Sequence, residues 1–197
     1  MPPPSGGSEA DAGAPPAALV RAGGLPADYP VLVERGLLDR LDAVVARHAP
    51  AHRYAVVSDE TVAALYGERV TGVLRQTGRA VELVTFPAGE ANKTREWWGR
   101  VTDRLLEEGL GRDAAVVAVG GGVTGDLAGF VAATYLRGVP VVQVPTSLVA
   151  MIDSSVGGKT GVDTAAGKNL VGAFHPPRAV AVDPEATVTL PRAERAQ

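Results

Sequence analysis

The sequence has 197 residues, of which 46% are hydrophobic, so it can bury the core of one well-packed domain. It contains no cysteine, which excludes disulfide bonds and thiolate metal sites, and its net charge of -3 provides no basic surface for nucleic acid. No apolar run approaches the roughly 20 residues that span a bilayer, and the N-terminus lacks a signal-peptide pattern, so we expect no membrane association and a cytoplasmic protein.

Residues 1–24 are rich in proline, glycine, alanine and serine. Such a composition cannot offset the entropy lost on ordering, so this segment is predicted to be a disordered leader. From Tyr29 onward, short β-branched runs alternate with longer segments of helical period, which is typical of βα units. We therefore predict one α/β domain over residues 25–191, with a Rossmann-like, mostly parallel sheet and helices on both faces.

The hydrophobic periods predict the elements in chain order. Strands are predicted at 31–33, 54–57, 81–86, 114–119, 139–144 and 179–182, and helices at 37–48, 61–76 and 94–108, with a further helix that begins near Gly125. In the helix at 94–108, one face is predicted to be buried, and it carries Trp97, Val101, Leu105 and Leu106. The last three strands are uninterrupted apolar runs, as expected for strands that are covered on both faces.

Three glycines follow directly on the strand predicted at 114–119, and the segment 120–126 reads GGGVTGD. A buried strand that ends in glycines before a helix lets backbone amides approach a diphosphate and points the helix N-terminus at its charge. Gly120, Gly122 and Gly125 also match the dinucleotide fingerprint, but the next strand lacks the acidic residue of an ordinary Rossmann dehydrogenase. The segment therefore indicates a variant nucleotide fold. A glycine turn that only permits tight strand–helix packing is the alternative.

A second cluster, DSSVGGKTG at residues 153–161, contains the Gly-Lys-Thr of a phosphate-binding loop. That loop needs a glycine where Asp153 stands and a strand that runs straight into it, so an NTPase of this type is rejected. We interpret the cluster as a Ser/Gly-rich turn that brings Asp153 and Lys159 into one site, with Lys168 and Asn169 adding an ammonium and an amide. These groups suit a substrate with several negative charges. Two solvated surface lysines are the alternative.

Three segments together resemble the central signature of the 3-dehydroquinate synthases, in the same order and spacing. They are GGGVTGDLAGFVAATYLRG at 120–138, QVPTSLVAMIDSSVGGKTGVD at 143–163 and GKNLVGAFHPP at 167–177. Ser58 with Asp59, and the segment PAGEANK at 87–93, resemble two earlier cofactor motifs of the family, so the resemblance extends from about Tyr29 to the C-terminus. Ser147 departs from the pattern, which commonly has a second threonine there, but it keeps the hydroxyl.

The resemblance implies that NAD is bound and transiently oxidises a ring alcohol of 3-deoxy-D-arabino-heptulosonate 7-phosphate, a sugar-acid phosphate. Phosphate is then eliminated, the ketone is reduced again, and the opened product closes to 3-dehydroquinate by an aldol step. By the same resemblance, Asp59 would bind the ribose of the adenosine. The other residues implied to surround the cofactor are Ala88, Gly89, Glu90, Ala91, Asn92, Lys93, Gly121, Gly122, Val123, Thr124, Gly125, Asp126, Thr146, Ser147, Lys159, Lys168, Ala186, Thr187, Val188 and Thr189.

For the substrate, the resemblance implies contacts from Asp153, Lys159 and Asn169. Arg137 is implied to reach the phosphate from a neighbouring subunit of a homodimer, and an ordinary surface arginine is the alternative. Lys159 and Arg137 can neutralise carboxylate and phosphate. Asp153 and Asn169 can hydrogen-bond hydroxyls, so that the reacting carbon faces the nicotinamide.

The three histidines, His48, His52 and His175, have no partner at metal-ligand spacing, so no metal site is predicted within these 197 residues. The resemblance implies a divalent metal, zinc or cobalt, that is held by a glutamate and two histidines of a second, helical domain. Residues 192–197 would begin the linker to that domain. The 197-residue chain by itself is therefore expected to lack synthase activity.

Three other functions stay open. A sister sugar-phosphate cyclase, above all the type that acts on an amino substrate, would share most of these motifs. An iron-dependent alcohol or glycerol dehydrogenase also carries a glycine triplet followed by an aspartate, but it should lack the Gly-Lys-Asn motif at 167–169. A non-catalytic NAD-binding module would bind NAD without turnover.

Overall fold

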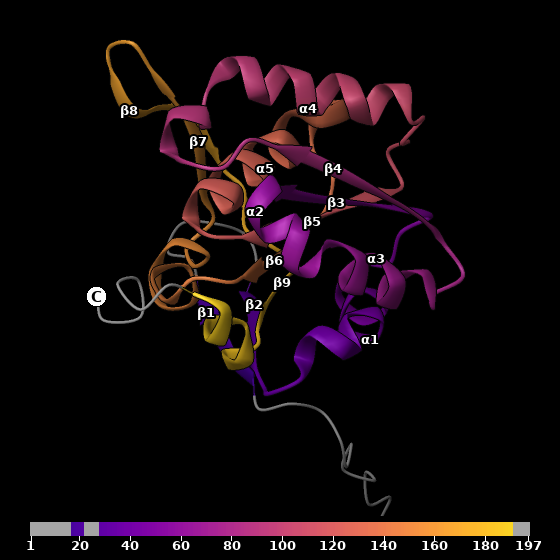
Figure 1. Ribbon diagram of the computed structural model, residues 1–197. Helices are drawn as coiled ribbons and strands as arrows, with labels where there is room; N and C mark the ends of the chain where they lie inside the picture. Colours follow the sequence, from indigo (N-terminus) through magenta and orange to yellow (C-terminus); the bar gives the residue numbers. More distant parts are fainter. Residues whose placement is uncertain (1–16, 22–27, 191–197) are drawn as a thin grey trace, which may run out of the picture.

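A computed structural model describes residues 17–21 and 28–190 and shows a central sheet between two layers of helices (Figure 1). The strands of this sheet are β1 (Ala17–Arg21), β2 (Asp28–Val33), β3 (Arg53–Asp59), β4 (Ala80–Phe86), β5 (Ala114–Gly120), β6 (Val141–Pro145) and β9 (Ala179–Val182). A separate antiparallel hairpin is formed by β7 (Lys159–Thr164) and β8 (Gly167–Phe174).

The helices cover both faces of the sheet. The longer ones are α1 (Leu41–His48), α3 (Glu68–Arg75), α4 (Arg95–Glu107) and α5 (Gly122–Thr134). Shorter helical segments are η1 (Leu37–Arg40), α2 (Glu60–Val62), η2 (Ala63–Gly67), η3 (Glu90–Asn92), η4 (Tyr135–Arg137), η5 (Ala150–Ser154) and η6 (Pro184–Thr189). In Figure 1, α1 and α3 lie on one side of the sheet and α4 and α5 on the other. No described helix has the length and apolar character needed to cross a membrane.

The strand order is β1-β2-β9-β6-β5-β3-β4, and all neighbouring pairs are parallel except β1 with β2. From β3 the chain passes to β4 at one edge, whereas from β5 it passes through α5 to β6 in the opposite direction. The direction of the connections therefore reverses between β3 and β5. In open α/β sheets, ligands bind outside the carboxyl ends of the strands at such a reversal.

The core consists of two apolar layers, one on each face of the sheet. Val117 of β5 packs in the layer that includes Leu41 and Leu74, and Val116 packs in the layer that includes Leu105 and Leu127. Every residue of β5 is buried, as predicted for a strand that is covered on both faces. These observations confirm the predicted Rossmann-like, mostly parallel α/β fold.

All six predicted strands occur, with bounds that shift by up to three residues, and the helix predicted at 61–76 is α2, η2 and α3 in succession. Two predictions were wrong in detail. Helix α5 begins at Gly122 rather than near Gly125, because the Gly125 N–H already donates to the Gly121 carbonyl at 3.0 Å. Leu106 is 53% exposed, because Leu105, four residues after Val101, takes the buried position on α4.

The predicted leader was wrong over Ala17–Arg21, which forms β1. This strand pairs antiparallel with β2 from Ala17 opposite Leu32 to Arg21 opposite Asp28. Backbone hydrogen bonds to the edge of β2 stabilise this strand, and the composition of residues 1–24 does not reveal such a partner. Residues 1–16 and 22–24 of the predicted leader, and the predicted linker at 192–197, lie outside the described residues.

The hairpin of β7 and β8 was not predicted, because its sequence is too rich in glycine to resemble a strand. Gly161 lies opposite Gly172, and a Cβ on Gly161 would lie 2.7 Å from the Val171 carbonyl oxygen. On α5, a Cβ at Gly129 would lie 2.5 Å from the Thr160 methyl group. Glycine is therefore required where the strands approach each other and where α5 approaches the hairpin. The Ser/Gly-rich turn predicted over 153–161 is in fact η5, a short loop and the start of β7.

Candidate nucleotide and substrate site

Asp59 lies at the reversal point of the sheet, and two hydrogen bonds hold its carboxylate. The Val62 N–H donates to Oδ1 at 3.0 Å, which makes Asp59 the N-cap of α2, and the Thr124 hydroxyl donates to Oδ2 at 3.1 Å. The hydroxyl of the preceding Ser58 donates to the Val119 carbonyl at 2.7 Å and joins β3 to β5. A carboxylate offers about four acceptor positions, so Asp59 keeps capacity for the hydroxyls of a ligand.

The glycines at the end of β5 leave space where a side chain would block the edge of the sheet. A Cβ at Gly120 would lie 2.5 Å from the Thr124 Cβ, and one at Gly122 would lie 3.0 Å from the Ser154 hydroxyl. Helix α5 starts at once, and its first turn carries no acidic residue. Free N–H groups and a positive helix end favour an anion there. The segment therefore has the space and the positive helix end that a diphosphate needs, and its contact with the diphosphate of a dinucleotide stays a prediction.

The remaining residues of the predicted diphosphate segment are oriented by packing. Thr124 is completely buried and Val123 is partly buried against the core. The Gly125 carbonyl accepts the Gln143 amide at 3.1 Å, and a Cβ at Gly125 would crowd that side chain. These residues hold the start of α5 in place rather than presenting polar side chains to a ligand.

Thr146 and Ser147 follow β6 and adjoin the glycines. The Thr146 N–H donates to the Gly120 carbonyl at 2.9 Å, and its side chain is buried. A Cβ at Gly121 would lie 3.4 Å from the Ser147 hydroxyl, which accepts the Ala150 N–H at 3.3 Å. The sequence-predicted residues after β5 and after β6 are therefore neighbours in space.

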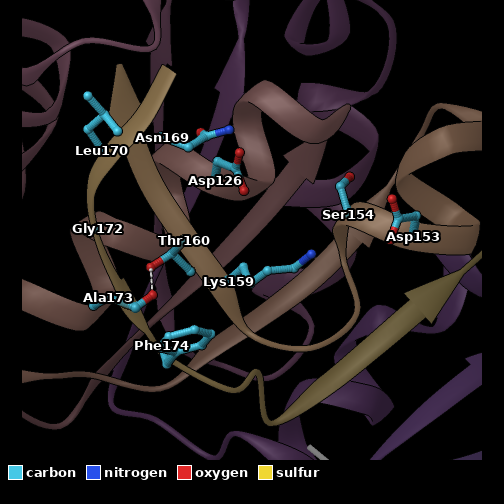
Figure 2. A pocket seen from close by; sticks show the side chains of 10 residues that line it. All are labelled: Asp126, Asp153, Ser154, Lys159, Thr160, Asn169, Leu170, Gly172, Ala173 and Phe174. Atoms are coloured by element: carbon cyan, nitrogen blue, oxygen red, sulfur yellow. Dashed lines mark hydrogen bonds between the residues drawn. The ribbon is translucent and has the colours of Figure 1, made fainter. Parts of the chain in front are cut away.

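A cavity of about 490 Å³ lies beside this edge of the sheet, between α5, η5 and the hairpin. Its lining residues are Asp126, Asp153, Ser154, Lys159, Thr160, Asn169, Leu170, Gly172, Ala173 and Phe174. Asp153, Lys159 and Asn169, which the sequence assigned to one site, come from three different elements and line this one cavity. Figure 2 shows the Lys159 ammonium extended toward Ser154 and Asp153, and the Asn169 amide beside Asp126.

Lys93 is a buried cation surrounded by three carboxylates, and we call these four side chains the Lys93 cluster. The Lys93 side chain is 4% exposed, and its ammonium lies 3.2 Å from Glu90, 3.3 Å from Asp126 and 3.6 Å from Asp163. Burial lowers the pKa of Lys93, but Glu90 and Asp126 outweigh burial and leave that pKa above its ordinary value. Burial raises the pKa of Asp126, against the opposing effect of Lys93. Glu90 and Asp163 raise this pKa further.

Lys168 does not line the first cavity. Its ammonium pairs with Glu90 at 3.2 Å, and both residues line a second cavity of about 540 Å³ together with Ala91. Ala88, Gly89 and Asn92 form the turn before this cavity, where the Asn92 amide donates to the Ala88 carbonyl at 2.9 Å and Gly89 has a φ of 102°. A positive φ at Gly89 favours glycine.

The segment Ala186 to Thr189 forms most of η6 and lines neither cavity. Ala186 is buried, and the Thr187 hydroxyl donates to the Pro184 carbonyl at 2.7 Å. The Thr189 hydroxyl lies 2.7 Å from the Tyr66 hydroxyl. Val188 is an exposed apolar side chain. The structure thus occupies these hydroxyls with internal hydrogen bonds, and their predicted role at the cofactor stays a prediction.

Arg137 ends η4 and lies on the surface, away from the lining of both cavities. Its φ is 71° and that of Leu136 is 48°, so two successive residues have a left-handed backbone. Such a backbone persists only where the surrounding structure holds it. The side chain is therefore presented from a defined turn, and it does not contact the cavity of its own chain.

Among residues 17–21 and 28–190, no three His, Cys, Asp or Glu side chains are placed so that they could hold a metal ion. The His175 Nε2 lies 2.9 Å from the Val139 carbonyl, in a structural contact. The described residues therefore do not fit the zinc or cobalt ion that the resemblance implies.

Sequence reasoning missed Ser154, Thr160 and Asp163. The Ser154 hydroxyl is buried beside Gly122 without a hydrogen-bond partner, and Thr160 donates to the Ala173 carbonyl at 2.7 Å within the hairpin. Asp163 accepts the Asn169 N–H at 2.8 Å. Ser154 and Thr160 line the first cavity and Asp163 lines the second, and only the folded chain places them there. The rejected phosphate-loop NTPase stays rejected, because Lys159 begins a strand rather than a helix.

A glycine-terminated strand at the reversal point of an open parallel sheet defines a Rossmann-like nucleotide-binding domain. Residues 83–197 match the family described as 3-dehydroquinate synthase N-terminal, and the chain belongs to this family. It is 54% identical over 167 residues to the 3-dehydroquinate synthase of Symbiobacterium thermophilum and 48% identical over 166 residues to that of Pelobacter propionicus. The matches cover 84% of this chain, which spans about half the length of these relatives, 47% and 46% respectively.

Solved structures of related enzymes share the fold. A 2-deoxy-scyllo-inosose synthase complexed with carbaglucose-6-phosphate, NAD+ and Co2+ has a TM-score of 0.83 at 27% identity, covering 91% of this chain and 48% of that chain. The 2-epi-5-epi-valiolone synthase ValA of Streptomyces hygroscopicus, with NAD+ and Zn2+ bound, has a TM-score of 0.76 at 34% identity, covering 89% and 48%. A glycerol dehydrogenase from Schizosaccharomyces pombe has a TM-score of 0.67 at 20% identity, covering 83% of this chain and 39% of that chain. At this identity the likeness shows the fold alone.

Proposed function

We propose that this chain is the NAD-binding part of a 3-dehydroquinate synthase, a carbon–oxygen lyase that converts 3-deoxy-D-arabino-heptulosonate 7-phosphate to 3-dehydroquinate and phosphate. The observation that carries the proposal is the cavity of about 490 Å³ beside the end of β5, which Asp153, Lys159 and Asn169 line together. A carboxylate, an ammonium and an amide in one cavity suit a polyhydroxylated, multiply anionic substrate. Membership of the family supports the same function.

The proposed cofactor site lies along the carboxyl ends of β3, β5 and β6. Gly121 and Gly122 would hold the diphosphate with their backbone N–H groups, assisted by the N-terminus of α5. Asp59 would accept a hydrogen bond from a ribose hydroxyl, because its carboxylate is already oriented by α2 and α5. Ser147 and the pair of Glu90 with Lys168 would complete the surroundings.

The residues of the first cavity would bind and orient the substrate. When bound, NAD supplies the reversible two-electron oxidation of the ring alcohol. Lys159 would neutralise a carboxylate or phosphate group of the substrate. Asp153 would accept hydrogen bonds from substrate hydroxyls and Asn169 would donate its amide hydrogens, so that the reacting carbon keeps one orientation.

Arg137 would act on a second copy of the chain. It lines neither cavity of its own chain, and its left-handed turn presents it at the surface. A guanidinium that approaches the neighbouring cavity would bind the substrate phosphate bidentately in a homodimer. The zinc or cobalt ion of the family finds no donor set among residues 17–21 and 28–190, so no metal-dependent step is assigned to them.

Calorimetric titration with NAD tests the cofactor site. We expect saturable binding, and Asp59→Ala should weaken it roughly tenfold, because one hydrogen bond to a charged group is lost. Asp103→Ala, which removes an exposed carboxylate from α4, is the matched control and should leave the affinity unchanged. If the unaltered chain fails to bind NAD, the proposed function is wrong.

Three ligands added to the NAD-loaded chain test the substrate class. The heptulosonate phosphate should bind, and Lys159→Met should abolish this binding, whereas glucose 6-phosphate and glycerol should not bind. Preference for glucose 6-phosphate would instead support a sister cyclase, and preference for glycerol a dehydrogenase. NAD binding with no affinity for any of the three would support a non-catalytic module.

A further inference from the structure

Asn169 has an unusual backbone conformation in the hairpin. Its φ is 57°, and it is one of three residues other than glycine with a positive φ in the part of the chain that the structure describes. The pairing of β7 with β8 shifts its register between Val162 and Thr164, opposite this region. Asparagine adopts the left-handed conformation more readily than other residues that carry a side chain, and a hydrogen bond to its backbone stabilises that conformation further.

Asp163 provides such a contact. Its Oδ1 accepts the backbone N–H of Asn169 at 2.8 Å, from the opposite strand of the hairpin. The Asp163 side chain is 17% exposed, and the same oxygen lies 3.6 Å from the buried ammonium of Lys93. The Asp163 N–H also donates to the Lys93 carbonyl at 2.7 Å. Both the backbone and the side chain of Asp163 are thereby held against Lys93.

Asn169 lines the first cavity beside Asp126, as Figure 2 shows, whereas Asp163 lines only the second. Asp163 therefore does not line the first cavity itself. It contacts the Asn169 backbone directly, and it approaches Asp126, the other lining residue nearby, only through Lys93. In a regular strand successive side chains alternate between the two faces, and the left-handed φ of Asn169 departs from that regular backbone.

We propose that Asp163 is a positioning residue for the substrate, which holds the Asn169 backbone in the left-handed conformation so that the Asn169 amide enters the cavity. This inference rests on the proposed function, which assigns Asn169 to the substrate. Asp163 also connects this position to the Lys93 cluster, because one carboxylate oxygen faces both the Asn169 N–H and the Lys93 ammonium.

Amide hydrogen exchange on the full 197-residue chain tests the contact without any ligand. Asp163→Ala should accelerate exchange of the Asn169 N–H roughly tenfold or more, because the hydrogen bond to a charged acceptor is lost. Asp163→Asn should restore most of the protection, because its carbonyl oxygen can still accept this N–H. Unchanged exchange at Asn169 in Asp163→Ala would overturn the proposal.

Ligand affinity tests the consequence for the substrate. In the NAD-loaded chain, Asp163→Ala should weaken binding of the heptulosonate phosphate roughly tenfold, as Asn169→Gly should, while NAD affinity changes less than twofold. The double variant should bind no more weakly than Asn169→Gly alone, because Asp163 acts through the Asn169 side chain. Additive losses in the double variant, or an equal loss of NAD affinity, would show a structural role and overturn the proposal.

Asp103→Ala is the control for both measurements and should change neither the exchange at Asn169 nor the affinities. Failure of the proposed function is recognised separately. If the unaltered chain binds neither NAD nor the sugar-acid phosphate, the function fails, and the exchange rate of Asn169 alone decides whether Asp163 holds its backbone.

Discussion

The Thr124 hydroxyl donates to the Asp59 carboxylate at 3.1 Å, across 65 positions of sequence. Thr124 belongs to the first turn of α5 and is completely buried, while Asp59 ends β3 and caps α2. The hydrogen bond therefore joins the two sides of the reversal point. It makes the orientation of the proposed ribose-binding carboxylate depend on the start of the helix that is proposed to hold the diphosphate.

Removing this hydroxyl while keeping the side-chain shape should destabilise the chain and weaken the proposed cofactor site. For Thr124→Val we expect the free energy of unfolding to fall by about 1 to 2 kcal/mol, because the Asp59 carboxylate loses a buried donor. Urea denaturation measures this change, and calorimetry should show weaker NAD binding. Thr124→Ser keeps the hydroxyl and is the control. Equal losses for both variants would contradict a role for the hydrogen bond.

Gly120 should not tolerate even a methyl group. Its Cβ would lie 2.5 Å from the Thr124 Cβ, so Gly120→Ala should lower the free energy of unfolding by about 1 to 3 kcal/mol through overpacking. Gly72 on α3 has open space around its Cβ position, so Gly72→Ala should raise the free energy of unfolding by roughly 0.5 to 1 kcal/mol. Thermal or urea unfolding of the two variants tests whether their free energies of unfolding change in opposite directions.

Substitution of the Asp183 carboxylate should destabilise the fold. It is 1% exposed and accepts backbone N–H groups from Gly36 at 3.2 Å, Leu38 at 3.1 Å and Glu185 at 3.0 Å. Asp183→Asn keeps the volume but turns one acceptor into a donor, and it should lower the free energy of unfolding by roughly 2 kcal/mol. Asp103→Asn on the surface of α4 should change it by less than about 0.5 kcal/mol. Similar values for both variants would refute this role for Asp183.

The pKa of Asp126 should produce a measurable pH dependence of stability. Burial raises this pKa above its ordinary value of 3.8, against the opposing effect of Lys93, so the folded chain binds the proton more tightly than the unfolded chain does. The wild type therefore loses stability at this position as the pH rises from 3.8 through the folded pKa. Each unit of pKa shift corresponds to about 1.4 kcal/mol.

Asp126→Asn does not titrate and should show no such loss. As the pH rises through this window, the free energy of unfolding of Asp126→Asn should increase relative to that of the wild type. Above the folded pKa of Asp126, the difference between the two proteins should become constant. Urea denaturation at a series of pH values measures it. Asp103→Asn is the reference, whose difference from the wild type should stay flat. If the wild type instead became more stable relative to Asp126→Asn over the same window, the pKa of Asp126 would not be raised.

The sheet and its helices were predictable because their signals are local. The apolar run of β5 and the amphipathic pattern of α4 each reflect burial on a regular period, which a sequence displays directly. The edge strand β1 and the hairpin of β7 and β8 were not predictable in this way. Hydrogen bonds to β2 stabilise β1, and the close approach of β7 and β8 to each other demands glycine in the hairpin.

For the site, motif resemblance grouped Asp153, Lys159 and Asn169, and the structure places all three around one cavity. Asp163 escaped notice because an aspartate in a glycine-rich segment carries no periodic or motif signal. Its importance comes from a hydrogen bond across the hairpin and from a buried cation that lies 70 positions earlier in the sequence, at Lys93.

The sequence by itself determined the α/β class, the glycine-terminated strand and the family to which the chain belongs, because short-range patterns and motifs encode each of these. The tertiary structure alone decided which charges meet. It buried Lys93 among three carboxylates. It also placed the Asp59 carboxylate, which caps α2, beside the Thr124 hydroxyl, and the Asp163 carboxylate beside the backbone N–H of the left-handed Asn169. These contacts join distant segments, and they form only when the packed sheet, helices and hairpin bring those segments within hydrogen-bond distance.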